Sequence, residues 1–295
     1  MKPAAFDYAR PASLDEACAM LAADDDARII AGGQTLVPLM AMRLARPRRL
    51  IDIARLAELA YIRREGDTVA VGATTKQCAL ERDAIIRADV PLLAKVMPFI
   101  GHAPTRARGT IGGSLANADP AAEIALVAVT LGATISYREG GATADIPASE
   151  FFIGPMMTAL PAAGCVTAVR FPVWRDARIG VGFHEISARR SDFAFASAAA
   201  QVALDEDGKC RRLALGIGAV TPSPLRLDAV GKAMAGTRPE AARVREAVTA
   251  ALADIEPLAD LHASADYRRR VAVSLAARAI AGAYASAESR EPHAR

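Results

Sequence analysis

Residues 109–120 (GTIGGSLANADP) constrain the fold of this chain more than any other segment. They combine three glycines with Thr110, Ser114 and Asn117, and they lie just ahead of a predicted helix. Glycines let backbone amides turn inward and approach a ligand closely, as phosphate-binding loops do. A second stretch of this kind, residues 31–35 (AGGQT), lies far upstream. Two such loops, brought together in space, would hold a dinucleotide.

Length and composition indicate a globular protein of several compact units. A chain of 295 residues exceeds the usual size of one hydrophobic core, so we expect two or three units. The 36 basic and 33 acidic residues give a net charge of only +3, and the paired arginines have no aromatic residues between them. This distribution argues against nucleic-acid binding.

The residue types that bind metals are scattered. No CxxC pair and no histidine ligand spacing occurs among Cys18, Cys78, Cys165, Cys210, His102, His184, His262 and His293. We therefore predict no metal site in this chain, and thiols that stay reduced in a cytosolic protein. The start of the chain has no apolar signal-peptide core, and no apolar run is long enough to span a bilayer. The expected location is cytoplasmic.

The first 54 residues predict a small unit that carries the first glycine loop. Ser13 and Glu16 form a capping box ahead of a helix. An apolar strand over residues 27–31 runs into the loop, Thr35 is expected to cap a helix over 36–44, and a strand follows over 50–53. Such a strand-to-helix turn aims amide groups and the positive end of a helix dipole at one point.

Residues 55–175 predict a second unit around the main glycine segment. Strands are expected over 68–73, 133–137 and 164–171, and helices up to residue 86 and over 91–101. Asp119 as N-cap, with Pro120 at the first helical position, predicts a further helix that ends at Gly132. Glu123 lies in its first turn, where complementing the helix dipole is a better interpretation than contact with a ligand.

The remainder predicts a separate α+β unit. Three strands (179–187, 196–204, 210–219) precede three helices (225–234, 239–255, 265–284). This order predicts an antiparallel sheet with helices on one face, followed by a charged tail over 286–295.

The glycine signal alone does not name the ligand. A Walker loop needs a Lys before Ser or Thr after its last glycine, and neither stretch has one. Two GxG sequences, at 180–182 and 216–218, do not continue into a Rossmann fingerprint, and no GxSxG elbow is present. Each glycine pair alone is more often a tight turn; two of them, each at the entrance to a helix, favour a nucleotide site.

Three segments together resemble a known family: residues 31–35, residues 106–123 (RARGTIGGSLANADPAAE) and residues 188–194 (ARRSDFA). They are similar to the FAD-binding medium subunit of molybdenum hydroxylases, the xanthine dehydrogenase and aerobic carbon monoxide dehydrogenase family. The resemblance implies an α+β chain. A vanillyl-alcohol-oxidase (PCMH)-type FAD-binding domain would span residues 1–175, with two α/β subdomains (about 1–54 and 55–175). A CO dehydrogenase flavoprotein C-terminal type domain, with a three-stranded antiparallel sheet and a helical bundle, would span 178–285.

The same resemblance implies the FAD contacts. They are Ala31, Gly32, Gly33, Gln34 and Thr35 of the first loop, Thr110, Ile111, Gly112, Gly113 and Ser114 of the second, and Glu123, Val166 and His184. Gln34-Thr35 replaces the commoner His-Ser or Gln-Ser of the family. Because the first loop has no histidine, the FAD is expected to be non-covalent. No side chain is implied as a general acid or base.

The implied function is electron transfer within a complex. A large molybdopterin subunit would hydroxylate a substrate, a small subunit with [2Fe-2S] clusters would pass electrons to the FAD of this chain, and an external acceptor would receive them. The complex would be a heterotrimer or a dimer of heterotrimers. Two alternatives stay open at this point: a self-sufficient FAD-dependent oxidoreductase of the same superfold, and a nucleotide-binding scaffold without redox turnover.

Overall fold

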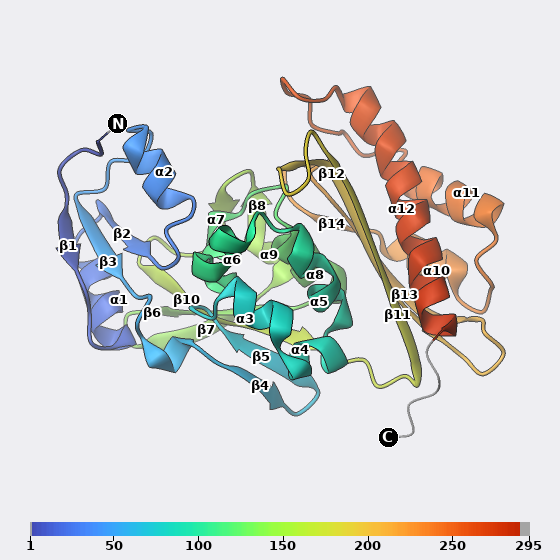
Figure 1. The fold of residues 1–295 in the computed structure, drawn as a ribbon, viewed down its shortest axis with the longest axis horizontal. Coiled ribbons are helices and arrows are strands. Elements are labelled where there is room, and N and C mark those ends of the chain that lie inside the picture. Colours follow the sequence, from blue (N-terminus) through green and yellow to red (C-terminus); the bar gives the residue numbers. More distant parts are fainter. Residues whose placement is uncertain (1, 290–295) are drawn as a thin grey trace.

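The computed structural model describes residues 2–289, which form three main sheets arranged along the length of the molecule and one two-stranded hairpin (Figure 1). The first is a small parallel sheet in the order β1-β3-β2, at the N-terminal end. Its elements, with the helices beside them, are β1 (Asp7–Ala9), α1 (Leu14–Ala22), β2 (Ala27–Ile30), α2 (Leu36–Ala41), β3 (Arg49–Asp52) and the 3-10 helix η1 (Ala57–Leu59). The predicted strand, glycine turn, helix and strand are therefore present over residues 27–52.

Helix α1 begins as its capping box predicts, with one difference. The Ser13 hydroxyl accepts a hydrogen bond from the Glu16 amide at 3.2 Å, whereas the Glu16 carboxylate accepts from the amide of Ala12 at 2.6 Å. The helix buries the predicted stripe of Leu14, Ala17, Cys18 and Leu21 against the sheet.

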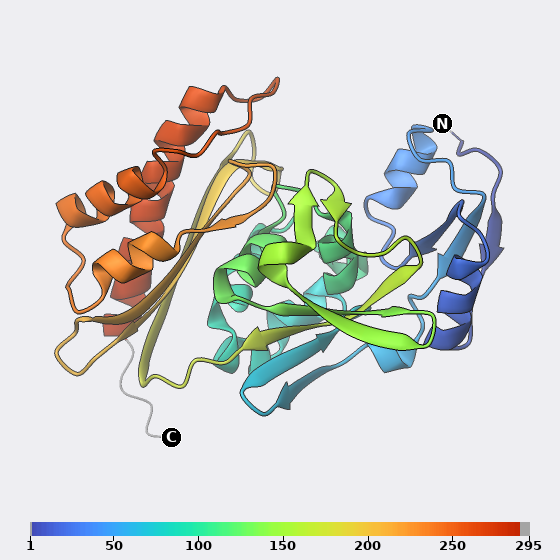
Figure 2. The ribbon, with the colours of Figure 1, turned by 180° about the vertical axis from the view of Figure 1, so that it is seen from behind.

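The second sheet lies in the middle of the molecule and is antiparallel, in the order β4-β5-β10-β6-β7. Its strands are β4 (Ile62–Glu65), β5 (Thr68–Gly72), β6 (Thr134–Glu139), β7 (Ala142–Pro147) and β10 (Gly164–Pro172). The helices that belong to it are α3 (Gln77–Arg82), α4 (Ala84–Asp89), α5 (Pro91–Val96), the 3-10 helix η2 (Met97–Phe99), α6 (Ala103–Arg108), α7 (Ile111–Asn117), α8 (Glu123–Leu131) and α9 (Ala148–Phe151), with the small hairpin β8 (Phe152–Gly154) and β9 (Met157–Thr158). Figure 2 shows this unit from behind.

Two predicted helices of this unit differ from the structure. The helix expected up to residue 86 is divided at Asp83, whose side chain accepts from the amide of Ile86 and starts α4. The helix expected from Pro120 begins only at Glu123, because the Asp119 carboxylate closes a turn by accepting from the Ala121 amide at 2.9 Å.

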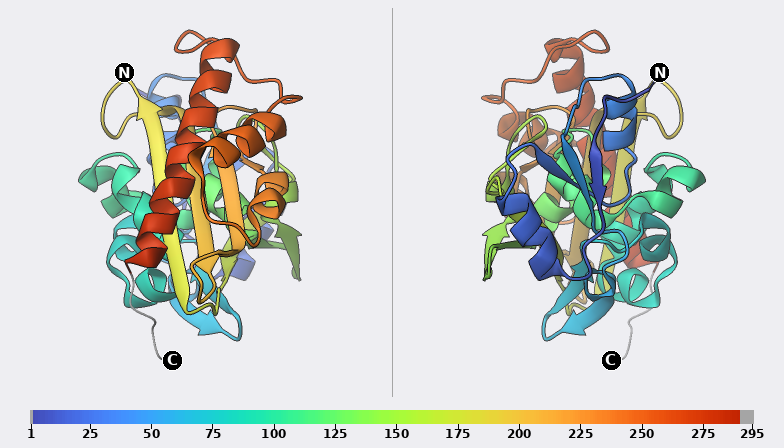
Figure 3. Two further views of the ribbon diagram at one scale, coloured as in Figure 1. Left: turned by 90° about the vertical axis from the view of Figure 1, so that its right-hand side faces the viewer. Right: turned by 90° about the vertical axis from the view of Figure 1, so that its left-hand side faces the viewer.

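The third sheet forms the C-terminal part. Its antiparallel strands are β11 (Arg178–Ser187), β12 (Ala194–Leu204), β13 (Cys210–Gly218) and β14 (Leu225–Arg226). The predicted count of three strands was therefore one short, because Leu225 and Arg226 pair with Ile217 and Gly216 instead of starting a helix. Three helices cover its outer face, as Figure 3 shows: α10 (Asp228–Met234), α11 (Ala241–Ala251) and α12 (Ala265–Glu288).

The GxG sequence of β11 serves helix packing. A Cβ built on Gly180 would lie 2.0 Å from the carbonyl oxygen of Ala283, and one built on Gly182 would lie 2.0 Å from that of Ala279. The two glycines therefore let α12 lie directly on the sheet, a close approach that any larger residue would prevent.

The opposite face of this sheet shares a core with the middle unit. Val181, Phe183 and Ala199 pack in one hydrophobic cluster with α5 and α8, and the ring of Phe183 meets that of Phe99 edge-on at 4.8 Å between centroids. No helix among the described residues is long and apolar enough to cross a membrane. Helix α12 extends three residues into the predicted tail; residues 290–295, with His293, lie outside the described part of the chain.

Candidate functional site

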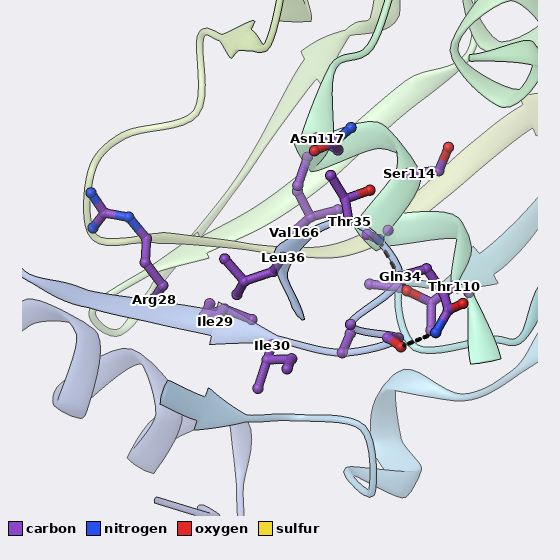
Figure 4. Close-up of a pocket in the computed structure, with 18 of the residues that line it drawn as sticks. Arg28, Ile29, Ile30, Gln34, Thr35, Leu36, Thr110, Ser114, Asn117 and Val166 are labelled. Carbon is purple, nitrogen blue, oxygen red and sulfur yellow. Dashed lines mark hydrogen bonds between the residues drawn. The ribbon is translucent and has the colours of Figure 1, made fainter. Parts of the chain in front are cut away.

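A cleft of about 920 Å³ lies where the first sheet, the middle unit and the loop before β12 meet. Its walls include both glycine segments, the β2 strand, the β10 end of the middle sheet, and residues 191–193. Figure 4 shows Gln34 and Thr35 from the first segment and Thr110, Ser114 and Asn117 from the second around the same space. The two segments are therefore brought together, as the sequence predicted.

The first glycine segment presents free backbone amides. Among the described residues, the N–H groups of residues 32–35 have no hydrogen-bond acceptor, while the carbonyl of Gly33 accepts from Val37. Gly33 holds the turn with φ of 67°, a value that a glycine adopts without strain. The Gln34 amide folds back and donates to the carbonyl of Gly32 at 3.2 Å. Four adjacent free amides are suited to bind phosphate oxygens.

Thr35 does not cap the helix that follows it. Its side chain makes no capping hydrogen bond, and its backbone is already helical. This part of the prediction was wrong, because the helix starts within the turn itself; the Thr35 hydroxyl stays available to the cleft that it lines.

The two glycine segments touch at one point. A Cβ built on Gly32 would lie 2.6 Å from the carbonyl oxygen of Arg108 and 2.8 Å from the Cα of Gly109. Both atoms belong to the backbone, so neither can move aside as a flexible side chain would. Because Gly32 has no side chain, its backbone can lie against the backbone of Arg108 and Gly109. This contact sets the distance between the two walls of the cleft.

The second glycine segment is the first turn of a helix and not an open loop. The Thr110 hydroxyl caps α7 by accepting from the Gly113 amide at 3.1 Å, and the amides of Ile111, Gly112 and Ser114 bond to backbone carbonyls. A Cβ on Gly112 would meet that of Ala73 at 2.4 Å, so this glycine serves packing against the end of β5. The expectation that both segments turn free amides inward was therefore wrong for this one. It offers the side chains of Ser114 and Asn117 instead.

Most residues implied as FAD contacts line the cleft. They are Ala31, Gly32, Gly33, Gln34, Thr35, Thr110, Gly112, Gly113, Ser114, Glu123 and Val166. Ile111 lies in the hydrophobic core with no exposed surface. His184 is outside the lining: it is exposed, and a Cβ on Gly282 of α12 would lie 4.0 Å from its Nε2 atom.

The lining contains residues that the sequence did not single out. Gln77 is 6 % exposed, and its Oε1 atom has no hydrogen-bond partner among the described residues. Gln77 belongs to no sequence motif. It reaches the cleft because its backbone N–H donates a hydrogen bond to the carbonyl of Gly109. The motif contains Asn117 without a predicted role, and Ile29 and Ile30 are predicted only as part of a buried strand; all three line the cleft.

Two acidic side chains of the cleft, Glu123 and Asp119, are held in a poorly solvated environment. Burial raises the pKa of Glu123 to about 8, and the charges of Glu185 and Asp119 add to this rise. Burial also raises the pKa of Asp119, against the opposing effect of its hydrogen bond from Ala121. With a pKa of about 8, Glu123 is largely protonated at neutral pH and can donate as well as accept a hydrogen bond.

The elements that form the cleft lie in regions that match two known protein families. Residues 4–174 match the model of the FAD binding domain in molybdopterin dehydrogenase, and residues 182–283 match the CO dehydrogenase flavoprotein C-terminal domain. The chain belongs to the FAD-binding medium subunits of the molybdenum hydroxylases. It is therefore a flavoprotein oxidoreductase subunit, and FAD is its cofactor.

Individual medium subunits are similar along their whole length. The chain is 35 % identical to the 6-hydroxypseudooxynicotine dehydrogenase complex subunit alpha of Paenarthrobacter nicotinovorans, with 96 % of each chain covered. It is 33 % identical to the carbon monoxide dehydrogenase medium chain of Afipia carboxidovorans, which covers 98 % of this chain and 100 % of the relative. A solved carbon monoxide dehydrogenase from Hydrogenophaga pseudoflava superposes with a TM-score of 0.92 at 34 % identity, over 97 % of this chain and 100 % of that one.

The cleft of this medium subunit fits FAD by its own features. Its volume is at the upper end of the range for small-molecule sites. The free amides of residues 32–35 suit the pyrophosphate, and the Ser114 and Asn117 side chains line the same cleft and can bind its polar groups.

Proposed function

We propose that this chain is the electron-transfer subunit of its complex: it accepts electrons from [2Fe-2S] clusters of a small subunit and passes them from FAD to an external acceptor. The observation that carries the proposal is the cleft, with four free amides on one wall and hydroxyl and amide side chains on the other. FAD supplies the electron chemistry when bound, because it takes up either one or two electrons.

The protein's own part is binding and orientation. We propose that the amides of residues 32–35 hold the pyrophosphate, with Ser114 and Asn117 opposite them. Glu123 would bind hydroxyl or ring nitrogen groups, and the apolar surface of Val166 would pack against a ring. The contact is non-covalent, since the first loop contains neither histidine nor cysteine.

The partners follow from the relatives. Relatives named "medium chain" and "complex subunit alpha" are parts of multi-subunit enzymes. We propose a large molybdopterin subunit that carries the substrate site and a small [2Fe-2S] subunit, in a heterotrimer or a dimer of heterotrimers. The substrate then belongs to the large subunit.

Two further proposals concern organisation and location. We propose the domain division at residues 175–178, with subdomains meeting near residue 54, and a C-terminal domain to residue 285. We also propose a cytoplasmic location, because the four cysteines are free thiols and three of them are buried.

The test is a spectrum of the complex purified with its native subunits. After anaerobic addition of the substrate of the large subunit, the proposal predicts bleaching of the flavin band together with the iron-sulfur absorbance. The band should return when an electron acceptor is added. Iron-sulfur reduction without flavin bleaching would contradict electron transfer through this chain.

A further inference from the structure

Two buried cysteines lie where the first unit packs against the middle unit. Cys18 is on α1 and Cys165 is near the start of β10; each is 1 % exposed, and both are free thiols. They belong to one hydrophobic cluster, and α1 packs directly against β10. Two cysteines that are far apart in the sequence therefore meet at one interface.

The register of the middle sheet turns the side chain of Cys165 toward α1. Cys165 pairs directly with Arg138 of β6, so the two side chains project from the same face of the sheet. The Arg138 guanidinium reaches α1, where it forms an ion pair with Asp15 at 2.6 Å. Cys165 therefore faces the same helix.

Cys18 lies on the side of α1 that meets this face of the sheet. It follows Asp15 by three residues, a spacing that places two side chains next to each other on a helix. Its Sγ atom lies 3.8 Å from the carbonyl oxygen of Arg138, the residue directly opposite Cys165. The ion pair and this sulfur contact together hold α1 over the Arg138–Cys165 pair, with the two thiols side by side.

An oxidant can reach the two thiols through the cleft. Cys165 lines the cleft, and so does Leu21, which lies about one helical turn beyond Cys18. Burial raises the pKa of Cys165 to about 12 and also raises the pKa of Cys18, so both thiols are protonated at neutral pH. Because the thiolate is the reactive form, we expect their oxidation to be slow.

We propose that Cys18 and Cys165 are a site of reversible oxidation, at which hydrogen peroxide converts the two thiols into a disulfide that ties α1 to β10. Cys165, which lines the cleft, attacks the peroxide and becomes a sulfenic acid with release of one water. The Cys18 sulfur then displaces the hydroxyl group as a second water. The two sulfur atoms together give two electrons to the peroxide, and the two thiol protons leave in the water.

The disulfide joins two walls of the cleft. Helix α1 belongs to the unit that carries the first glycine segment, whereas Cys165 is followed directly by Val166, which lines the cleft from the middle sheet. The bond closes a loop over residues 18–165, so it restricts the unfolded chain strongly. A thiol reductant breaks the bond again and releases the two units.

The first experiment treats the FAD-free chain with hydrogen peroxide, blocks the remaining thiols and maps its peptides without reduction. The map should contain a peptide pair that links Cys18 to Cys165 and that a thiol reductant separates. Cys18→Ala and Cys165→Ala should each lose this pair, and Cys78→Ala, at a half-buried position, is the matched control that should retain it. Cys18 and Cys165 that stay free while Cys78 is oxidised, or that link to Cys78 or Cys210, would overturn the inference.

The second experiment compares the melting temperature of the oxidised chain before and after reduction. The oxidised chain should melt about 5–10 °C higher, because a cross-link across a long loop destabilises the unfolded state. Cys78→Ala should show the same difference, and Cys18→Ala should show none. An oxidised wild type that carries the mapped link and melts at the same temperature as the reduced chain would overturn the claim that the bond holds the two units together.

Discussion

Gly32 sets the width of the cleft, and this makes it a sensitive residue. A Cβ here would collide with two backbone atoms of the opposite segment, at 2.6 and 2.8 Å. We expect Gly32→Ala to force the walls apart and weaken FAD binding at least about tenfold, or ~1.4 kcal/mol, in a calorimetric titration. Gly141→Ala is the matched control, since a Cβ at Gly141 meets nothing within 4 Å. Equal affinity of the two variants would contradict this role of Gly32.

Glu123 should make the FAD-free protein less stable as the pH rises. The folded chain retains the proton of Glu123 up to a pKa of about 8, whereas the unfolded chain releases it near its ordinary value of about 4.3. Between these values the folded state binds more protons, so the free energy of unfolding decreases with increasing pH. Glu123→Gln removes this dependence.

The measurement is the melting temperature at pH 5 and pH 8. Glu123→Gln should gain stability relative to the wild type at pH 8 and much less at pH 5, with the control Glu150→Gln, at an exposed position, unchanged at both. A larger gain at pH 5 than at pH 8 would contradict the raised pKa.

Among single residues, those in sequence motifs were predictable, whereas those that reach the cleft through tertiary packing were not. The first glycine segment and Ser114 could be placed in the site from local glycine and hydroxyl patterns, whereas Glu123 was implied only by the family resemblance, since its position alone favours a role at the helix dipole. Gln77 could not, since the pairing of Lys76 with Thr110 that brings it to the cleft joins residues far apart in the sequence. The orientation of His184 depends on which face of β11 meets α12, which the sequence alone did not determine.

Helix α12 and strand β11 each place a glycine where they pack together, Gly282 and Gly182. The two glycines differ in how much room a side chain would have. A Cβ on Gly182 would lie 2.0 Å from the carbonyl oxygen of Ala279, whereas one on Gly282, opposite it, has only ordinary contacts at 3.8 and 4.0 Å. Gly182→Ala should therefore separate the helix from the strand and cost about 2–3 kcal/mol. Gly282→Ala should stabilise by up to about 1 kcal/mol, because alanine favours a helix over glycine. Urea unfolding curves measure the free energy of unfolding of both variants. A change of the same sign in both would contradict this packing.

Arg268 anchors the start of α12 to the sheet. It is 3 % exposed, donates to the carbonyls of Phe195 and Ala219, and pairs with Asp260 at 2.6 Å. Arg268→Met should cost about 2–4 kcal/mol, because it leaves two carbonyls unpaired and removes the ion pair of the buried Arg268 with the half-exposed Asp260. Arg270→Met on the same helix is the control. Equal decreases of the urea midpoint in Arg268→Met and Arg270→Met would contradict this role of Arg268.

Element types were largely predictable, and their ends were not. Hydrophobic periodicity located α1, β2, β12 and β13 well. The GTIGG segment was read as an open loop, although Thr110 is a strong N-cap and the segment begins a helix. The helix expected from Leu225 lost two residues to β14, because strand pairing with β13 satisfies their backbone groups.

At the scale of the whole molecule, one hydrophobic core crosses from the middle unit to the C-terminal sheet and joins these two parts. Phe183 is 3 % exposed and packs edge-on against Phe99 within this core. Phe183→Ala should cost about 3–5 kcal/mol, with Phe6→Ala, at an exposed position, as the control. Because the core is shared, Trp174 fluorescence and circular dichroism should report one unfolding midpoint in the wild type. Two separate midpoints would contradict a shared core.

The most direct test of the account is a titration of the FAD-free chain with FAD, and separately with FMN, followed by flavin fluorescence and calorimetry. We predict one FAD per chain, and FMN binding weaker by at least about tenfold, because FMN lacks the pyrophosphate that the free amides of residues 32–35 suit, and lacks the adenosine. FMN binding as tight as FAD, or no binding of FAD, would contradict the assignment of the cleft.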